Sequence, residues 1–313
     1  MKNLRIGVVG CGRWGRNIIR TLVELARSHP VELVAIVNTG GAESTRIVRE
    51  QFGLECRSDL LPALDALDAV CIVVPDESHA ALARIALEKD LHVFVEKPIA
   101  GTLAETDALL DLARSRAVRL TVGHLLVFHP CIDAIHERLW RLGQRPRAIF
   151  SSRLATFPRR AGKTVLRSSL VHDIAIVDAF LACLPLEVHA RGFPPPMRDS
   201  EHLDVLLRYG GVTVHLVGSS IWPEAQRVFL LWTESHCFIF DNRENDLRVY
   251  RSTGEAYTLE ERLAPPGAPL TLELMNFIQS ISGSAELRVG PDHIRRVMQT
   301  IDLIESHGAG VPS

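Results

Sequence analysis

Three glycines near the N-terminus constrain the fold of this chain most, because they lie where an apolar run ends and a helical pattern begins. They are Gly10, Gly12 and Gly15 of the segment Leu4-Arg-Ile-Gly-Val-Val-Gly-Cys-Gly-Arg-Trp-Gly15. The segment predicts a strand, a tight turn and a helix N-terminus. Gly10 permits the turn, Gly12 lacks the Cβ that would block a pyrophosphate, and Gly15 lets the helix pack closely. Backbone N–H groups and the positive helix end then face the anion. A plain glycine-rich turn is the alternative interpretation.

The composition of the chain limits the classes of protein to which it can belong. The 313 residues suffice for two domains, each with its own core. Because 35 Lys and Arg balance 37 Asp and Glu, no large basic surface for nucleic acid is expected. The apolar runs are too short to span a bilayer and no signal-peptide pattern precedes the first strand, so we expect a cytoplasmic protein without a membrane partner. Six scattered cysteines without ligand spacing favour reduced thiols over disulfides or a metal site.

The order of apolar patterns predicts two different domains. Strand-like and helical runs alternate over residues 4–122, which is typical of an α/β, doubly wound parallel sheet, the Rossmann arrangement. The strands that follow are rich in β-branched and aromatic residues, and they predict an α+β domain with an open-faced, mostly antiparallel sheet. Helical patterns at 270–282 and 292–305 close the chain. We therefore expect a dinucleotide-binding domain at 1–123 and a substrate-binding and oligomerisation domain at 124–313.

Residues expected around a dinucleotide lie after the predicted strands. Arg13 and Trp14 stand inside the glycine segment. Asn38 follows the second strand, where an acidic residue normally binds the ribose hydroxyls of NAD. An amide can bind a hydroxyl but does not repel a 2′-phosphate, so NAD is favoured while NADP stays open. Pro75 and His79 follow the fourth strand and are expected to border the adenine and the nicotinamide ribose; a His79 that caps the next helix is an equal alternative.

The segment Glu96-Lys97-Pro98 ends the fifth strand. Lys97, held beside a cofactor with Glu96, can donate a hydrogen bond to a substrate hydroxyl and carry a proton. Pro98 would fix the direction of the backbone, and a cis peptide bond is one way to do so. The alternative, a surface ion pair of Glu96 and Lys97 on a loop, fits less well with a position on the ligand-binding edge of the sheet.

Four segments together resemble the glucose–fructose oxidoreductase/inositol dehydrogenase family of nicotinamide-dependent sugar dehydrogenases. They are the glycine segment, Pro75-Asp-Glu-Ser-His79, Glu96-Lys97-Pro98 and Gly123-His-Leu-Leu-Val-Phe-His-Pro130. Ser152-Arg153, Val171-His-Asp-Ile174 and Ser220-Ile-Trp222 are most similar to family members that oxidise the 3-hydroxyl of UDP-N-acetylglucosamine or of its uronate. The resemblance implies a nicotinamide cofactor, and homodimers or homotetramers formed through the second domain's sheet.

The same resemblance assigns a proton acceptor. His172 would face the substrate hydroxyl, with Lys97 as its partner and Asp173 beside the substrate. A neutral imidazole suits proton abstraction near neutral pH. Without the resemblance, a histidine at this point of a helical run is more often a core or interface residue. Most relatives carry an aspartate four residues earlier, where this chain has Ser168. A serine cannot stabilise an imidazolium as a carboxylate does, which leaves Lys97 a larger share of the proton transfer.

The predicted substrate follows from arginines and from the resemblance. Relatives place arginines near the nucleotide where this chain has Arg153, Arg159 and Arg160, and guanidinium groups bind phosphate oxygens in pairs. Ordinary solvated arginines are the alternative. We predict hydride transfer from the 3-hydroxyl carbon of a UDP-amino sugar, UDP-N-acetylglucosamine first, to NAD, giving a 3-keto sugar nucleotide for lipid A or surface glycan synthesis. A dehydrogenase for free polyols such as inositol and a non-catalytic dinucleotide-binding regulator remain alternatives; Ser168 favours the latter.

Overall fold

The computed structural model describes residues 3–37, 41–156, 164–194 and 200–307, and the chain divides into two units. Unit 1 comprises Met1–Leu125 and Pro269–Arg295, and unit 2 comprises Leu126–Ala268 and Arg296–Ser313. The chain thus leaves unit 1 close to the expected boundary but returns to it late. The returning helix buries Leu274 and Phe277 in the core of unit 1, where the Phe277 ring lies 6.1 Å from that of Phe94.

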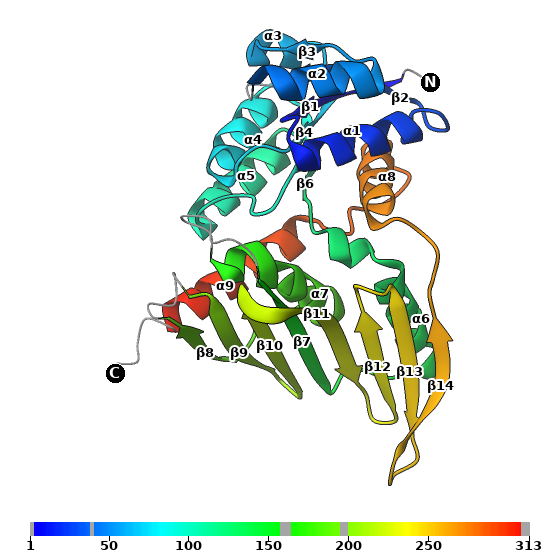
Figure 1. The fold of residues 1–313 in the computed structure, drawn as a ribbon. Helices are drawn as coiled ribbons and strands as arrows, with labels where there is room; N and C mark the ends of the chain where they lie inside the picture. The colour runs from blue at the N-terminus through cyan, green and yellow to red at the C-terminus, as the bar shows by residue number, and fades with distance from the viewer. Residues whose placement is uncertain (1–2, 38–40, 157–163, 195–199, 308–313) are drawn as a thin grey trace. The chain divides into compact units, whose positions relative to one another are not determined.

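Unit 1 contains a parallel sheet with the strand order β3-β2-β1-β4-β5-β6, which confirms the predicted Rossmann arrangement (Figure 1). All four residues of β4 are buried, as expected for a strand covered by helices on both faces. The short elements β3 and α3 were not predicted. The bounds are β1 Leu4–Val9, α1 Arg13–Leu25, β2 Val31–Val37, α2 Gly41–Phe52, β3 Cys56–Arg57, α3 Leu60–Leu64, β4 Ala69–Ile72, α4 His79–Glu88, β5 His92–Val95, α5 Leu103–Ser115, β6 Leu120–Val122 and α8 Pro269–Ile281.

Unit 2 contains an eight-stranded sheet with the order β14-β13-β12-β11-β7-β10-β9-β8. Only β7 and β10 pair in parallel, so the predicted mostly antiparallel sheet is confirmed. β14 was not predicted, and the strand that the sequence predicts over 228–232 is only the last part of β11. The bounds are α6 Pro130–Leu142, β7 Ala148–Thr156, α7 Val171–Leu181, β8 Glu187–Phe193, β9 His202–Tyr209, β10 Val212–Ser219, β11 Ile221–Trp232, β12 His236–Asp241, β13 Asp246–Ser252, β14 Tyr257–Leu263 and α9 Pro291–His307.

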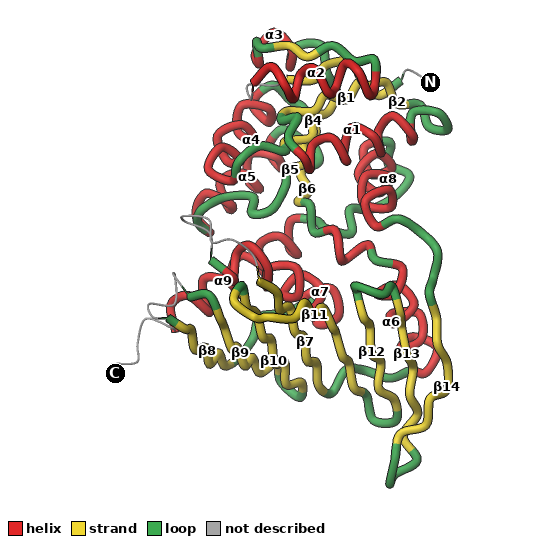
Figure 2. Tube along the Cα trace, in the orientation of Figure 1, coloured by secondary structure: helices red, strands yellow, loops and turns green. Residues whose placement is uncertain are grey.

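Helices α6 and α7 cover one face of the eight-stranded sheet (Figures 1 and 2). Phe180 of α7 stacks on Phe229 of β11 with ring centroids 5.9 Å apart, and His129 at the start of α6 lies 4.5 Å from the Phe240 ring. Along β9 buried and exposed residues alternate, and Leu206 is one of the exposed ones. The sheet therefore has an open face, as predicted.

All six cysteines carry free thiols. Burial raises the pKa of the Cys11 thiol to about 12 and that of Cys237 to about 11, so these groups stay protonated at neutral pH. These buried thiols are therefore weak nucleophiles at neutral pH. Within the described part of the chain, no helix is both long and apolar enough to cross a membrane.

Candidate functional site

The glycine turn between β1 and α1 depends on two of its glycines for packing. Gly10 has a φ of +105°, and a Cβ there would lie 2.2 Å from the carbonyl oxygen of Val73. A Cβ on Gly15 would lie 2.0 Å from the carbonyl oxygen of Gly10. The third glycine therefore packs mainly against the turn itself, and any larger residue would displace the backbone that shapes it.

Gly12 differs from both, because a Cβ there would meet nothing within 4 Å. It is the N-cap of α1, no side chain caps this helix end, and no acidic residue stands in the first turn. The first amides of a helix lack acceptors within the helix. The space, the amides and the absence of negative charge in this described turn fit the pyrophosphate of a dinucleotide. Arg13, the first residue of α1, is exposed beside it.

Trp14 and Glu96 connect the glycine turn to the end of β5. The indole Nε1 of Trp14 donates a hydrogen bond to the Glu96 carboxylate, which also accepts one from the backbone N–H of Lys97 at 3.3 Å. A Cβ on Gly123 would lie 2.8 Å from Glu96 Oε1, so the glycine after β6 makes room for this carboxylate. Burial raises the pKa of Glu96, while the Trp14 hydrogen bond and the Lys97 charge oppose the shift.

His79 connects the loops that follow β4 and β5. Its side chain is 1% exposed, with Nδ1 2.7 Å from the Pro98 carbonyl oxygen and Nε2 2.9 Å from that of Val74. The imidazole therefore clamps the Lys97–Pro98 segment, whose peptide bond is cis, to the neighbouring strand end. This contact differs from the predicted helix cap, and it leaves the predicted ribose contact untested. Pro75 is exposed at the same edge.

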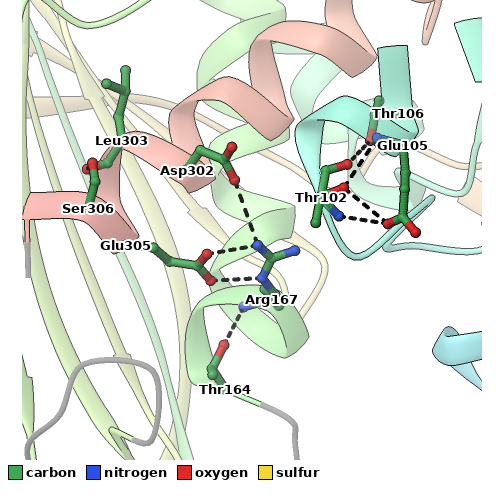
Figure 3. Close-up of polar contacts among 9 residues, drawn as sticks. All are labelled: Thr102, Glu105, Thr106, Thr164, Arg167, Asp302, Leu303, Glu305 and Ser306. Atoms are coloured by element: carbon green, nitrogen blue, oxygen red, sulfur yellow. Dashed lines mark hydrogen bonds and ion pairs between the residues drawn. The ribbon is translucent and has the colours of Figure 1, made fainter. Parts of the chain in front are cut away.

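In unit 2, His172 lies half-buried in the first turn of α7. A π-helical segment, Leu166–Leu170, comes immediately before it; such segments are frequent at functional sites. Arg167 of this segment binds Glu305 of α9 through two hydrogen bonds of 2.7 Å, and Figure 3 shows the pair. The Ser168 hydroxyl donates to the carbonyl oxygen of Thr164 at 2.6 Å. The Ser168 hydroxyl is thus turned towards the backbone.

Arg153 and Asp173 bind each other. Arg153 Nε lies 2.7 Å from Asp173 Oδ2 and Nη2 lies 3.0 Å from Oδ1, while the Ser151 hydroxyl donates to Oδ1 at 2.8 Å. Asp173 is 1% exposed. Both residues were predicted to contact substrate, but their charged groups here hold α7 on β7, directly beside His172. Asn38, Arg159 and Arg160, the other predicted contacts, lie outside the described residues.

Arg227 was missed by the sequence analysis. It stands opposite Arg153 in the register of β7 and β11, and it is exposed. Partial burial lowers its pKa, and the nearby charges of Arg153 and Arg243 lower it further. The sequence prediction placed the start of this strand at Val228, one residue later, so Arg227 was not considered as a strand residue. A concentration of guanidinium groups of this kind is suited to binding an anion.

Comparison with known proteins agrees with these features. Residues 4–124 match the model of an oxidoreductase family with an NAD-binding Rossmann fold, that of glucose–fructose oxidoreductase and inositol dehydrogenase. Residues 4–124 therefore carry the NAD-binding domain of this oxidoreductase family. It is 27% identical to a UDP-N-acetylglucosamine 3-dehydrogenase of Acidithiobacillus ferrooxidans over 300 residues, 90% of each chain. It is 32% identical over 201 residues to a dTDP-3,4-didehydro-2,6-dideoxy-α-D-glucose 3-reductase of Streptomyces violaceoruber, covering 61% of this chain and 58% of that protein.

The fold is also that of a solved family member. A crystal structure of the Acidithiobacillus ferrooxidans enzyme superposes with a TM-score of 0.86 and covers 98% of this chain and all of that one, at 22% identity. The match makes residues 4–124 an NAD-binding Rossmann domain and the protein an NAD-dependent oxidoreductase.

Proposed function

We propose that this oxidoreductase oxidises the 3-hydroxyl of a UDP-amino sugar, with UDP-N-acetylglucosamine as first substrate and NAD as hydride acceptor. The observation that carries the proposal is the exposed guanidinium of Arg227, which has the cationic Arg243 as a neighbour. A diphosphate needs such charges, whereas an uncharged polyol does not. The relative that is 27% identical over nine-tenths of both chains supports the same substrate.

Proton transfer is assigned to Lys97 and His172. When bound, NAD accepts the hydride that leaves the sugar carbon, and the hydroxyl proton must go to a group of the protein. Lys97 is directed by the His79 clamp on Pro98, and His172 is directed by the Arg153–Asp173 pair next to it. Because Ser168 carries no charge, an imidazolium at His172 receives no carboxylate stabilisation from that position. Lys97 is therefore expected to carry the larger share of the proton relay: its ammonium gives up a proton to solvent before it takes the hydroxyl proton, and His172 orients the hydroxyl and shares its proton.

Two further features of the prediction belong to this proposal. Leu206, Phe193 and Leu259 are exposed large hydrophobic residues of the sheet in unit 2. Their exposure supports a homodimer or homotetramer formed through that sheet, which sedimentation analysis of the purified protein tests. A cytoplasmic enzyme that delivers a 3-keto sugar nucleotide to amino-sugar synthesis for lipid A or surface glycans fits the free thiols and the proposed substrate.

The decisive experiment compares substrates by the absorbance of the reduced cofactor at about 340 nm, the band on which nicotinamide dehydrogenases are followed. We expect turnover with UDP-N-acetylglucosamine and NAD, and poor turnover with free N-acetylglucosamine or inositol. Arg227→Gln should raise KM for the UDP-sugar about ten- to a hundredfold with little change in kcat, because a charge-assisted hydrogen bond is lost at a distance from the reacting carbon. Arg145→Gln, at another exposed arginine of unit 2, is the matched control. If inositol is oxidised equally well and Arg227→Gln behaves as wild type, a polyol dehydrogenase replaces this proposal.

A further inference from the structure

Glu273 of α8 is a buried acid that the reaction described above does not use. Its side chain is 2% exposed, and neither carboxylate oxygen has a hydrogen-bond partner among the described residues. An ionised carboxylate without partners is strongly disfavoured in such surroundings. The position therefore needs a physical explanation, and its location in unit 1 supplies one.

Two contacts determine the direction of α8 against the sheet of unit 1. Arg119, just before β6, donates from Nε to the carbonyl oxygen of Ser280 at 3.2 Å, so the C-terminal end of α8 lies at the amino edge of the strands. The ring of Phe277, earlier in α8, lies 6.1 Å from that of Phe94 within β5. The helix therefore runs antiparallel to the strands, and its N-terminal part approaches their carboxyl edge.

This direction brings two carboxyl groups together. Glu273 lies one turn before Phe277, and Glu96 lies two residues after Phe94, on the same side of the extended chain. From Phe277 to Glu273 along α8, and from Phe94 to Glu96 along the chain, the direction is in both cases towards the carboxyl edge of the sheet. Glu273 is therefore placed beneath Glu96, which itself accepts a hydrogen bond from Trp14 of the glycine turn.

The positive charge near the two carboxyl groups is too small to compensate two negative charges. Burial, and then the negative charge of Glu96, raise the pKa of Glu273 well above its ordinary value. Burial also raises the pKa of Glu96, with Lys97 opposing and Asp76 adding to the shift. The Cys71 thiol of β4 is neutral, because burial and both glutamates raise its pKa. Among the described residues, Lys97 is the cation beside this pair of acids, which favours a single negative charge on the pair.

We propose that Glu96 and Glu273 share one proton, and that binding of the oxidised dinucleotide expels this proton whereas binding of the reduced form retains it. Glu96 contacts the glycine turn and lies at the carboxyl edge, where dinucleotides bind in such sheets. The oxidised nicotinamide ring carries one positive charge more than the reduced ring, so it stabilises the doubly ionised pair. The proton leaves to solvent and no electron moves. The inference requires the dinucleotide site but not the proposed sugar substrate, so failure of one leaves the other intact.

The test is calorimetric titration of the wild-type protein with NAD⁺ and with NADH, each in phosphate and in Tris buffer. These buffers differ in ionisation enthalpy, so the difference in heat gives the number of protons released. We expect more release with NAD⁺ than with NADH, and a ratio of NAD⁺ to NADH affinity that rises with pH. The limit for one proton is about tenfold per pH unit.

Glu273→Gln should remove the excess release with NAD⁺ and flatten the pH dependence of the affinity ratio. Glu24→Gln, the same change at an exposed position of α1, should leave both unchanged. Equal release with NAD⁺ and NADH in the wild-type protein overturns the proposal, as does undiminished excess release in a folded Glu273→Gln protein. If the glutamine variant fails to fold, the wild-type comparison of the two cofactors still decides.

Discussion

Replacing Arg153 by alanine should destabilise unit 2 by about 3–5 kcal/mol, the usual cost of leaving a buried charge without its partner. The guanidinium makes two hydrogen bonds of 2.7 and 3.0 Å to Asp173, and the two side chains are only 12% and 2% exposed. Solvent therefore screens the pair weakly. The hydrogen bond from Ser151, about 1 kcal/mol, would remain but carries no charge.

Urea unfolding followed by circular dichroism measures this loss for Arg153→Ala, Asp173→Asn and the double variant. The double variant should be less destabilised than the sum of the two, because it removes the stranded charge together with its partner. Arg227→Ala, the exposed register neighbour, is the control and should stay within about 0.5 kcal/mol of wild type. If Arg153→Ala is as stable as this control, the pair does not hold α7 on β7, and the explanation of how His172 is oriented is refuted.

Two further predictions concern titration and catalysis. Burial lowers the pKa of His129 from its ordinary 6.5 to about 4, and its Nδ1 accepts a hydrogen bond from the Cys131 N–H at the start of α6. The folded state thus binds the proton more weakly than the unfolded state, so about 3 kcal/mol of stability should be lost as pH falls from 6.5 to 4. In urea unfolding across this range, His129→Asn, which can still cap the helix, should flatten the loss; an unchanged slope would contradict the assignment. Lys97→Met and His172→Asn should each reduce turnover about 10²- to 10⁴-fold, while calorimetry should show that both variants still bind NAD. The surface change Lys89→Met is the control, and near-normal turnover in both site variants would place proton transfer elsewhere.

The features predicted correctly from the sequence are those that depend on residues close together in the chain. The glycine turn and the alternation of strands and helices over residues 4–122 depend on neighbours in the chain, so they could be predicted and were found. The helix at 270–282 was likewise predicted within a residue of its observed bounds. The unit against which this helix packs was not predicted, because an amphipathic pattern shows that one face of a helix is buried but does not identify the surface that covers it. Tertiary contacts such as that of Phe277 with Phe94 assign α8 to unit 1.

The candidate site shows the same limit at the level of single side chains. Arginine at position 153 was interpreted as a phosphate ligand from its residue type and its family position. Its partner Asp173 lies on α7, and no local sequence pattern predicts that β7 and α7 are in contact at these two residues. His79 is comparable, because its two acceptors come from loops after different strands. The residue types predicted which interactions these side chains can make, whereas the fold determines the partner with which each of them interacts.

The pairing of charges separates structural residues from candidates for function. Arg153 with Asp173, Arg167 with Glu305 and Arg296 with Asp178 form close ion pairs whose acids are largely shielded from solvent. Each pair satisfies its own charges and has little left to offer a ligand. Arg227 and Glu273 differ, because no oppositely charged side chain in the described ranges forms an ion pair with either. A charge that the fold leaves uncompensated lowers stability unless a ligand or a proton balances it. A diphosphate can do so at Arg227, and a shared proton can do so at Glu273.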